Sequence, residues 1–139
     1  MSFEEKGTWV YAVIAVALAL IYFAIVLGQL PQTAASDITF QVPLLAAIGA
    51  TIGLTIAAHI LVAIMAPDDA GRRDQRDKDI NRYGEYVAGL ILGLSAVVPL
   101  ALALAEADHF WIANTIYLAF VLSTVSGSIV KIVAYRRGF

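Results

Sequence analysis

The 139-residue chain has no cysteine and only two histidines. The absence of cysteine excludes disulfides, thiolate catalysis and cysteine-ligated metal. His59 lies inside an apolar run and His109 in a distant loop, so the two cannot ligate one haem, and no second ligand accompanies His59 at metal spacing. We therefore expect a non-enzyme with no catalytic residue, no metal and no cofactor.

Charge is also scarce, because 14% of the residues are charged while 60% are apolar. A soluble domain with one core does not need so much apolar surface. Four apolar runs have no acid or base at their centres, and each is near the roughly 20 residues that cross about 30 Å of hydrocarbon. They cover approximately 9–30, 42–66, 84–105 and 110–133.

Backbone polar groups in lipid must be satisfied internally, so runs of this length predict helices. The predicted fold is all-α: a four-helix transmembrane bundle made by one integral membrane domain, residues 1–139. The first run is too long, and its leading segment too acidic, for a cleaved secretory signal, so we expect it to be a retained span.

Lysine and arginine are absent from the two loops at 31–41 and 106–109. All nine of these bases lie before the first run, between the second and third, or at the end of the fourth. Because cytoplasmic segments carry the excess of Lys and Arg, this asymmetry predicts that both termini and the segment 67–83 are cytoplasmic. The predicted location is the plasma membrane, crossed several times.

Small residues recur at four-residue spacing within three of the runs. Such stripes let helix backbones approach closely, and they predict tight bundling, a homo-oligomer or burial in a larger membrane complex without separating these outcomes. The helix-packing set is Gly49, Gly53 and Ala57, then Gly89 and Gly93, then Ser123 and Gly127.

Three single positions carry local predictions. Pro99 lies inside the third run and should kink that helix by leaving a carbonyl unpaired. Asp108 precedes the aromatic start of the fourth run and suits a helix cap, which explains the polar turn around it better than a cation site does. Glu85 and Lys131 fall at similar depth, where either an ion pair between them or snorkelling of Lys131 alone would keep the charges near the interface.

Thr51, Thr55 and His59 form a polar stripe on the second span, because their spacing is i, i+4 and i+8. A titratable side chain at membrane depth is a functional-site hypothesis. Two interpretations stay open for His59: a neutral imidazole hydrogen-bonded to a neighbouring helix, or a group that senses pH or a ligand.

The segment APDDAGRRDQRDKDINRYGEY separates the two apolar halves of the chain. Its five acids and five bases between Asp68 and Arg82 cancel, which argues against direct binding of nucleic acid, and their solvated mixture argues against acid–base catalysis. Helical charge spacing from Arg72 onward predicts that the third helix extends into the cytoplasm. The predicted partner-docking residues are Arg73, Asp74, Arg76, Asp77, Asp79, Ile80 and Tyr83.

The stretches FEEKGTWV, DQRDKDINRYGEYV, EADHFWIAN and VKIVAYRRGF resemble a family of small four-span actinobacterial membrane proteins with a D-x-R-D juxtamembrane motif. Asp74, Arg76, Asp77 and Asp79 occupy that motif, and Gln75 replaces a more usual acid. Such proteins are often encoded beside a helix-turn-helix transcription regulator. The resemblance implies a membrane partner that holds or releases a cytoplasmic regulator.

Three functions follow as hypotheses. The first is a regulatory, sensory or scaffolding membrane protein that docks a soluble partner through residues 72–83. The second is a small dimeric transporter or channel that uses the stripe in the second span. The third is an accessory subunit of a larger membrane complex.

Overall fold

The computed structural model describes residues 1–68, 70 and 74–138, and this part of the chain is helical without strands. Four helical segments are long and apolar enough to cross a membrane, which confirms the prediction of an all-helical chain with four possible spans. The elements are α1 (Phe3–Leu27), the 3-10 turn η1 (Ala35–Asp37), α2 (Gln41–Met65), α3 (Gln75–Ser95), α4 (Val97–Leu104) and α5 (His109–Arg137).

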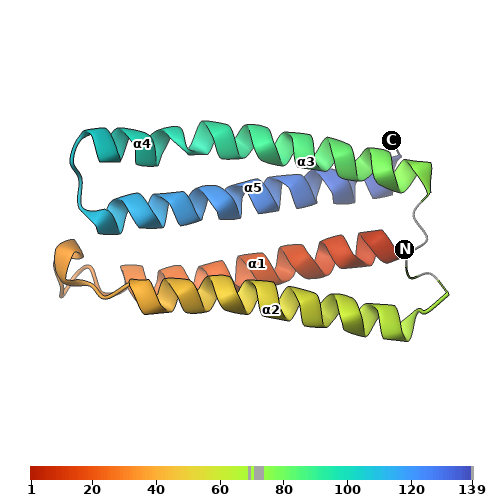
Figure 1. The fold of residues 1–139 in the computed structure, drawn as a ribbon, viewed down its shortest axis with the longest axis horizontal. Coiled ribbons are helices and arrows are strands. Elements are labelled where there is room, and N and C mark those ends of the chain that lie inside the picture. Colours follow the sequence, from red (N-terminus) through yellow and green to blue (C-terminus); the bar gives the residue numbers. More distant parts are fainter. Residues whose placement is uncertain (69, 71–73, 139) are drawn as a thin grey trace.

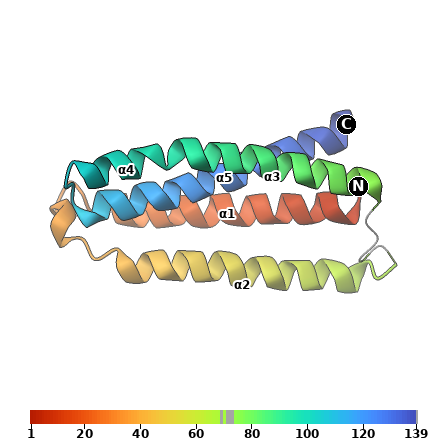
Figure 2. The same ribbon diagram turned by 45° about the horizontal axis from the view of Figure 1, so that its top comes forward.

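The helices form two antiparallel hairpins, one from α1 and α2 and the other from α3, α4 and α5 (Figure 1). Contacts between α1 and α5 join the hairpins, so α1 and α5 are central while α2 and α3 are peripheral. Figure 2 shows α2 standing apart from the second hairpin. We call the end that holds both termini and the start of α3 the basic end, and the opposite end the turn end.

Side-chain caps and one proline set the helix boundaries. Ser2 accepts a hydrogen bond from the backbone N–H of Glu5 at the start of α1. Asp108 caps α5 by accepting from the N–H of Phe110 at 3.0 Å, as predicted. The third span breaks at Ala96 between α3 and α4. Pro99 has no N–H to offer the carbonyl of Ser95, so the break lies where the sequence predicts a kink.

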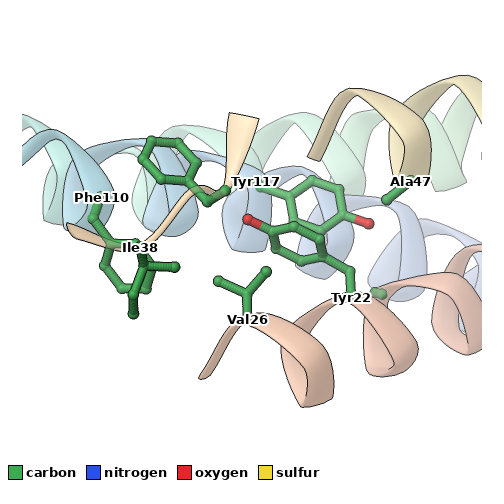
Figure 3. Packing of buried hydrophobic residues seen from close by; sticks show 8 residues of the cluster. Tyr22, Val26, Ile38, Ala47, Phe110 and Tyr117 are labelled. Atoms are coloured by element: carbon green, nitrogen blue, oxygen red, sulfur yellow. The ribbon is translucent and has the colours of Figure 1, made fainter. Parts of the chain in front are cut away.

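The hydrophobic core lies toward the turn end (Figure 3). Val26 and Phe110 are fully buried there, and the loop before α2 folds Ile38 and Phe40 over them. The rings of Phe40 and Phe110 meet edge to face, with 5.6 Å between centroids. This aromatic packing ties both hairpins together at the turn end.

The second hairpin is closed by a backbone approach at two glycines. A Cβ placed on Gly127 would lie 2.9 Å from the Cβ of Ala88 and 3.1 Å from the carbonyl oxygen of Gly84. One turn away, the Ser123 hydroxyl donates to the carbonyl of Ala88 at 2.8 Å. Small side chains therefore hold α3 against α5, as expected for helices that associate by packing and hydrogen bonds in lipid.

The other predicted packing glycines have no such neighbour. Apart from the nearby backbone of its own helix, a Cβ built on Gly49, Gly53, Gly89 or Gly93 has no atom within 4 Å in the part of the chain that the structure describes. Ala57 is also exposed. Of the predicted helix-packing set, Ser123 and Gly127 join helices of one chain. The remaining members face outward, because α2 packs on α1, and α3 on α5, through other faces.

Candidate functional site

A cavity of about 340 Å³ lies between α1, α2 and α5. Four of its lining residues carry hydroxyl groups: Tyr11 of α1, Thr51 of α2, and Tyr117 and Thr124 of α5. The remaining lining residues are apolar: Ala15, Ile48, Ile52, Phe120 and Val121. Thr51 lies about 15 Å along α2 from Gln41, so the cavity is near the middle of a helix that is long and apolar enough to cross a membrane.

The hydroxyl groups of the cavity are only partly engaged. Thr51 donates to the carbonyl of Ala47, four residues earlier on its own helix, at 2.8 Å. The hydroxyl oxygens of Tyr11 and Thr124 are 3.4 Å apart, well beyond the roughly 2.7 to 2.8 Å usual between hydroxyl oxygens. The site therefore has hydrogen-bonding capacity left over.

The rest of the predicted polar stripe lies beyond Thr51 toward the basic end. His59 Nδ1 is 2.8 Å from the carbonyl oxygen of Thr55, so Nδ1 carries the hydrogen in the neutral ring. This bond stays within α2 and does not reach a neighbouring helix, because the ring folds back along its own helix. The Nε2 edge faces Gly7 of α1, where an added Cβ would be 2.9 Å away.

Thr55 contributes a second unusual group. Its hydroxyl oxygen is buried and has no hydrogen-bond partner among the described residues. Buried polar groups are normally hydrogen-bonded. The face of α2 that carries Thr55 and His59 therefore has a hydroxyl group whose hydrogen-bonding capacity is unused among the described residues.

A buried polar pair between the hairpins was missed by sequence reasoning. Tyr22 donates to Oδ1 of Asn114 at 2.6 Å, and Asn114 donates to the carbonyl of Phe110 at 2.7 Å. The rings of Tyr22 and Tyr117 meet edge to face with 5.1 Å between centroids, and Figure 3 shows their hydroxyls pointing in opposite directions. The available signal was a tyrosine at the centre of the first span, because a phenol at that depth needs a partner.

The basic end is held together by polar contacts from three helices. Arg76 of α3 donates to the carbonyl of Tyr135 at 3.2 Å, in the last turn of α5. Lys131 and Glu85 form an ion pair at 2.5 Å, one of the two predicted arrangements. Arg136 approaches Glu5 at 3.7 Å and lies 5.7 Å from the ring centre of Trp9, which adds α1 to the cluster.

Most of the predicted partner-docking residues are engaged within the chain. Asp74 and Asp77 form a reciprocal capping box at the start of α3, and Asp77 is also hydrogen-bonded to Tyr135. Ile80 is fully buried, so it is not available to a partner, because it faces inward from α3. Arg73 lies outside the described residues.

An exposed hollow remains on the outer side of α3. It is lined by Asp79, Arg82, Tyr83 and Tyr86, which we call the α3 surface. Tyr83 is 48% exposed and Tyr86 is 64% exposed. Asp79 accepts a hydrogen bond from Gln75 at 3.1 Å, which fixes its carboxylate on the helix. Asp79 and Tyr83 of this surface belong to the predicted docking set, whereas Arg82 and Tyr86 do not.

The described residues contain no group of three or more His, Asp and Glu side chains that could hold a metal ion. No protein-family model, curated protein or solved structure matches the chain.

Proposed function

We propose that this protein is a non-enzymatic membrane protein that holds a soluble cytoplasmic protein at its basic end. The distribution of bases supports the orientation, because cytoplasmic segments are enriched in Lys and Arg. Both termini and the start of α3 lie at that end (Figure 1). The proposal places all of them in the cytoplasm.

One observation carries the proposal. The first turns of α3 precede the apolar part of the helix and are fixed to α5 by the bond from Arg76 to Tyr135. This anchoring leaves the α3 surface exposed on a rigid helix, with Arg82 and two aromatic rings. Tyr and Arg are enriched at protein interfaces because they combine large contact area with directed hydrogen bonds.

The proposed partner is a soluble transcription regulator of the helix-turn-helix class, which is the partner that the family resemblance implies. The membrane protein would hold or release this regulator and would not itself bind nucleic acid.

The orientation can be tested with single cysteines, since the chain has none of its own. We expect a membrane-impermeant maleimide to label Gln32→Cys from the outside of intact cells and Lys78→Cys only after the membrane is opened. Both positions are exposed, so their labelling reports topology and not burial. The reverse pattern would contradict the proposed orientation.

Docking can be tested by replacing Tyr86 with a photoreactive amino acid. We expect a cross-link to the co-expressed regulator in cells, and we expect Arg82→Glu to abolish it. The matched control places the same photoreactive residue at Trp111, which is 39% exposed at the turn end. Docking through the α3 surface would be wrong if Tyr86 and Trp111 gave the same products.

A second function, a small dimeric transporter or channel, is favoured by one observation. Thr51 is joined at the cavity by Tyr11 and Thr124, so polar groups from three helices meet at membrane depth. Transport pathways have such groups on several helices. Flux of protons or small cations into proteoliposomes tests this function, and equal flux with wild type and with His59→Ala would remove the stripe from the pathway.

Association in the membrane is a third proposal, either as a homo-oligomer or as an accessory subunit. The outward glycines of α2 support it, since Gly53 meets no other atom of the described chain within 4 Å. Disulfide cross-linking of Gly53→Cys in native membranes is the test. A homo-oligomer gives a dimer band that a cysteine on the loop, such as Gln32→Cys, does not give.

A further inference from the structure

We propose that the cavity between α1, α2 and α5 binds a neutral, lipid-soluble molecule that carries a hydrogen-bond acceptor. This site is independent of the docking proposal, because it lies within the membrane-spanning part of the chain and shares no residue with the α3 surface.

The lining excludes a charged ligand. Nine residues surround the cavity, and none of them is Asp, Glu, Lys, Arg or His. Transfer of an unpaired charge to such a site is strongly unfavourable, because neither water nor a counter-charge replaces its hydration. The occupant must therefore be neutral.

The side walls favour an apolar body that arrives through the bilayer. Ile52 is 57% exposed and Phe120 is 54% exposed at the rim. These side chains belong to α2 and α5, which stand apart because α2 packs on α1. A molecule dissolved in the bilayer can thus enter sideways between α2 and α5, and a tail longer than the cavity can remain in the lipid.

The hydroxyl groups favour an acceptor on that molecule. Tyr11 and Thr124 supply two O–H groups, and their mutual contact at 3.4 Å uses one of them weakly. Tyr117 supplies a third O–H group to the same cavity. The Thr51 hydrogen is already used by the carbonyl of Ala47. A carbonyl, ether or hydroxyl oxygen placed between Tyr11 and Thr124 would receive a stronger hydrogen bond than either residue now makes.

The volume fits the polar head and adjoining carbons of such a molecule. About 340 Å³ is at the lower end of the roughly 300 to 1,000 Å³ found for small-molecule sites. An ordinary acyl chain could fill the same space, but it would leave one of the Tyr11 and Thr124 hydroxyls without an acceptor and the other with only their weak mutual contact. Discrimination between an acceptor-bearing molecule and a hydrocarbon is therefore the property to measure.

The experiment uses three photoreactive probes in phosphatidylcholine proteoliposomes containing the full chain. The first is a long-chain methyl ketone with a diazirine near its carbonyl, the second is the alkane of equal length with the diazirine at the same position, and the third is phosphatidylcholine with a diazirine in its acyl chain. After illumination, mass spectrometry maps the labelled residues. We expect the ketone to label residues 48–52 and 120–124 about fivefold more than either reference probe does, the preference that one net hydrogen bond provides.

Variants that remove hydroxyls without changing shape give the matched comparison. Tyr11→Phe combined with Tyr117→Phe and Thr124→Val should reduce ketone labelling of the cavity to the level of the alkane. Thr115→Val is the control, because it removes a threonine hydroxyl from the same helix as Thr124, at a position that does not line the cavity. We expect it to leave the labelling unchanged.

A competition experiment on the unaltered protein avoids any dependence on folding of the variants. Excess unlabelled methyl ketone should displace the ketone probe from the cavity, whereas the unlabelled alkane should not. Equal labelling of the cavity by ketone, alkane and phospholipid would mean that bulk lipid occupies it and would overturn the proposal. Ketone labelling that survives excess unlabelled ketone would overturn it as well.

Discussion

The predicted small-residue stripes on α2 and α5 have different outcomes in the two hairpins. In the second hairpin, Gly127 sits against Ala88 and the carbonyl of Gly84, so the backbones of α3 and α5 approach closely. In the first, Gly49 and Gly53 face away from α1 and meet no described atom. Four-residue spacing is thus common to both hairpins, but only one of them uses it to close its own helix pair.

This difference teaches that a small-residue stripe defines a face on which a helix can pack, without naming the helix that packs there. The second hairpin is closed by backbone contact and a hydrogen bond from Ser123. The first leaves room for a cavity beside α1, with hydroxyls on its wall. We regard the second hairpin as the rigid half and the first as the half that can receive a ligand or a further helix.

The largest expected effect is at Gly127. Gly127→Leu should destabilise the protein by about 3 kcal/mol, because the side chain would have to displace the Ala88 methyl group and the Gly84 backbone. Gly53→Leu is the matched control and should change stability by less than about 0.5 kcal/mol. Unfolding measured by steric trapping in bicelles would check both. Equal losses would remove the distinction between the hairpins.

The next effect concerns the bond between the hairpins. Tyr22→Phe should destabilise the protein by about 1 to 1.5 kcal/mol, because it leaves Oδ1 of buried Asn114 without its donor. Tyr86→Phe makes the same chemical change on an exposed residue and should have almost no effect on stability. The same unfolding assay checks the pair, and a neutral Tyr22→Phe would mean that Asn114 readily finds another partner.

A double-mutant cycle can sharpen the comparison within the first hairpin. Gly7→Ala should push the His59 ring away from α1 and weaken its bond to Thr55. We expect this substitution to be about 1 kcal/mol more destabilising in the wild type than in the His59→Ala background. The four unfolding free energies check the coupling. A coupling near zero would show that the His59 ring moves freely.

The smallest expected effect is at Arg76. Arg76→Gln should lower stability by roughly 0.5 kcal/mol, because the bonds from Arg76 to the last carbonyls of α5 are partly solvated. Hydrogen exchange should nevertheless rise at the start of α3 and in the last turn of α5. Lys78→Gln, on an exposed neighbouring position, is the control for loss of a base. Unchanged exchange would contradict the anchoring role.

Much of the fold follows from local features of the sequence. Four spans can be predicted because charge is missing from four long runs, and lipid then leaves the backbone no alternative to a helix. The break before Pro99 and the cap at Asp108 depend on single residues and their neighbours, so they were predictable too. The pair of Glu85 and Lys131 required only that two span ends lie at one depth.

The candidate sites were less predictable because they depend on which helix faces meet. Tyr11 and Thr124 are separated by the greater part of the chain, and only the packing of α1 on α5 brings them to the cavity. The same holds for Ile80, whose burial was not visible from a charged and apparently solvated segment. Periodicity identifies the residues that share a helix face. Contacts between helices also depend on how each helix is rotated about its axis and on which helices are neighbours.

The hydrogen bond between Tyr22 and Asn114 has a consequence for biosynthesis. Its two residues are 92 positions apart, and the first hairpin is complete long before Asn114 has been translated. At a translation rate of about 5 to 20 residues per second, Asn114 is synthesised roughly 5 to 20 seconds after Tyr22. During that interval the Tyr22 hydroxyl of the first hairpin lacks its hydrogen bond to Asn114. The hydrogen bond between the two halves of the nascent chain can form only after α5 has been synthesised.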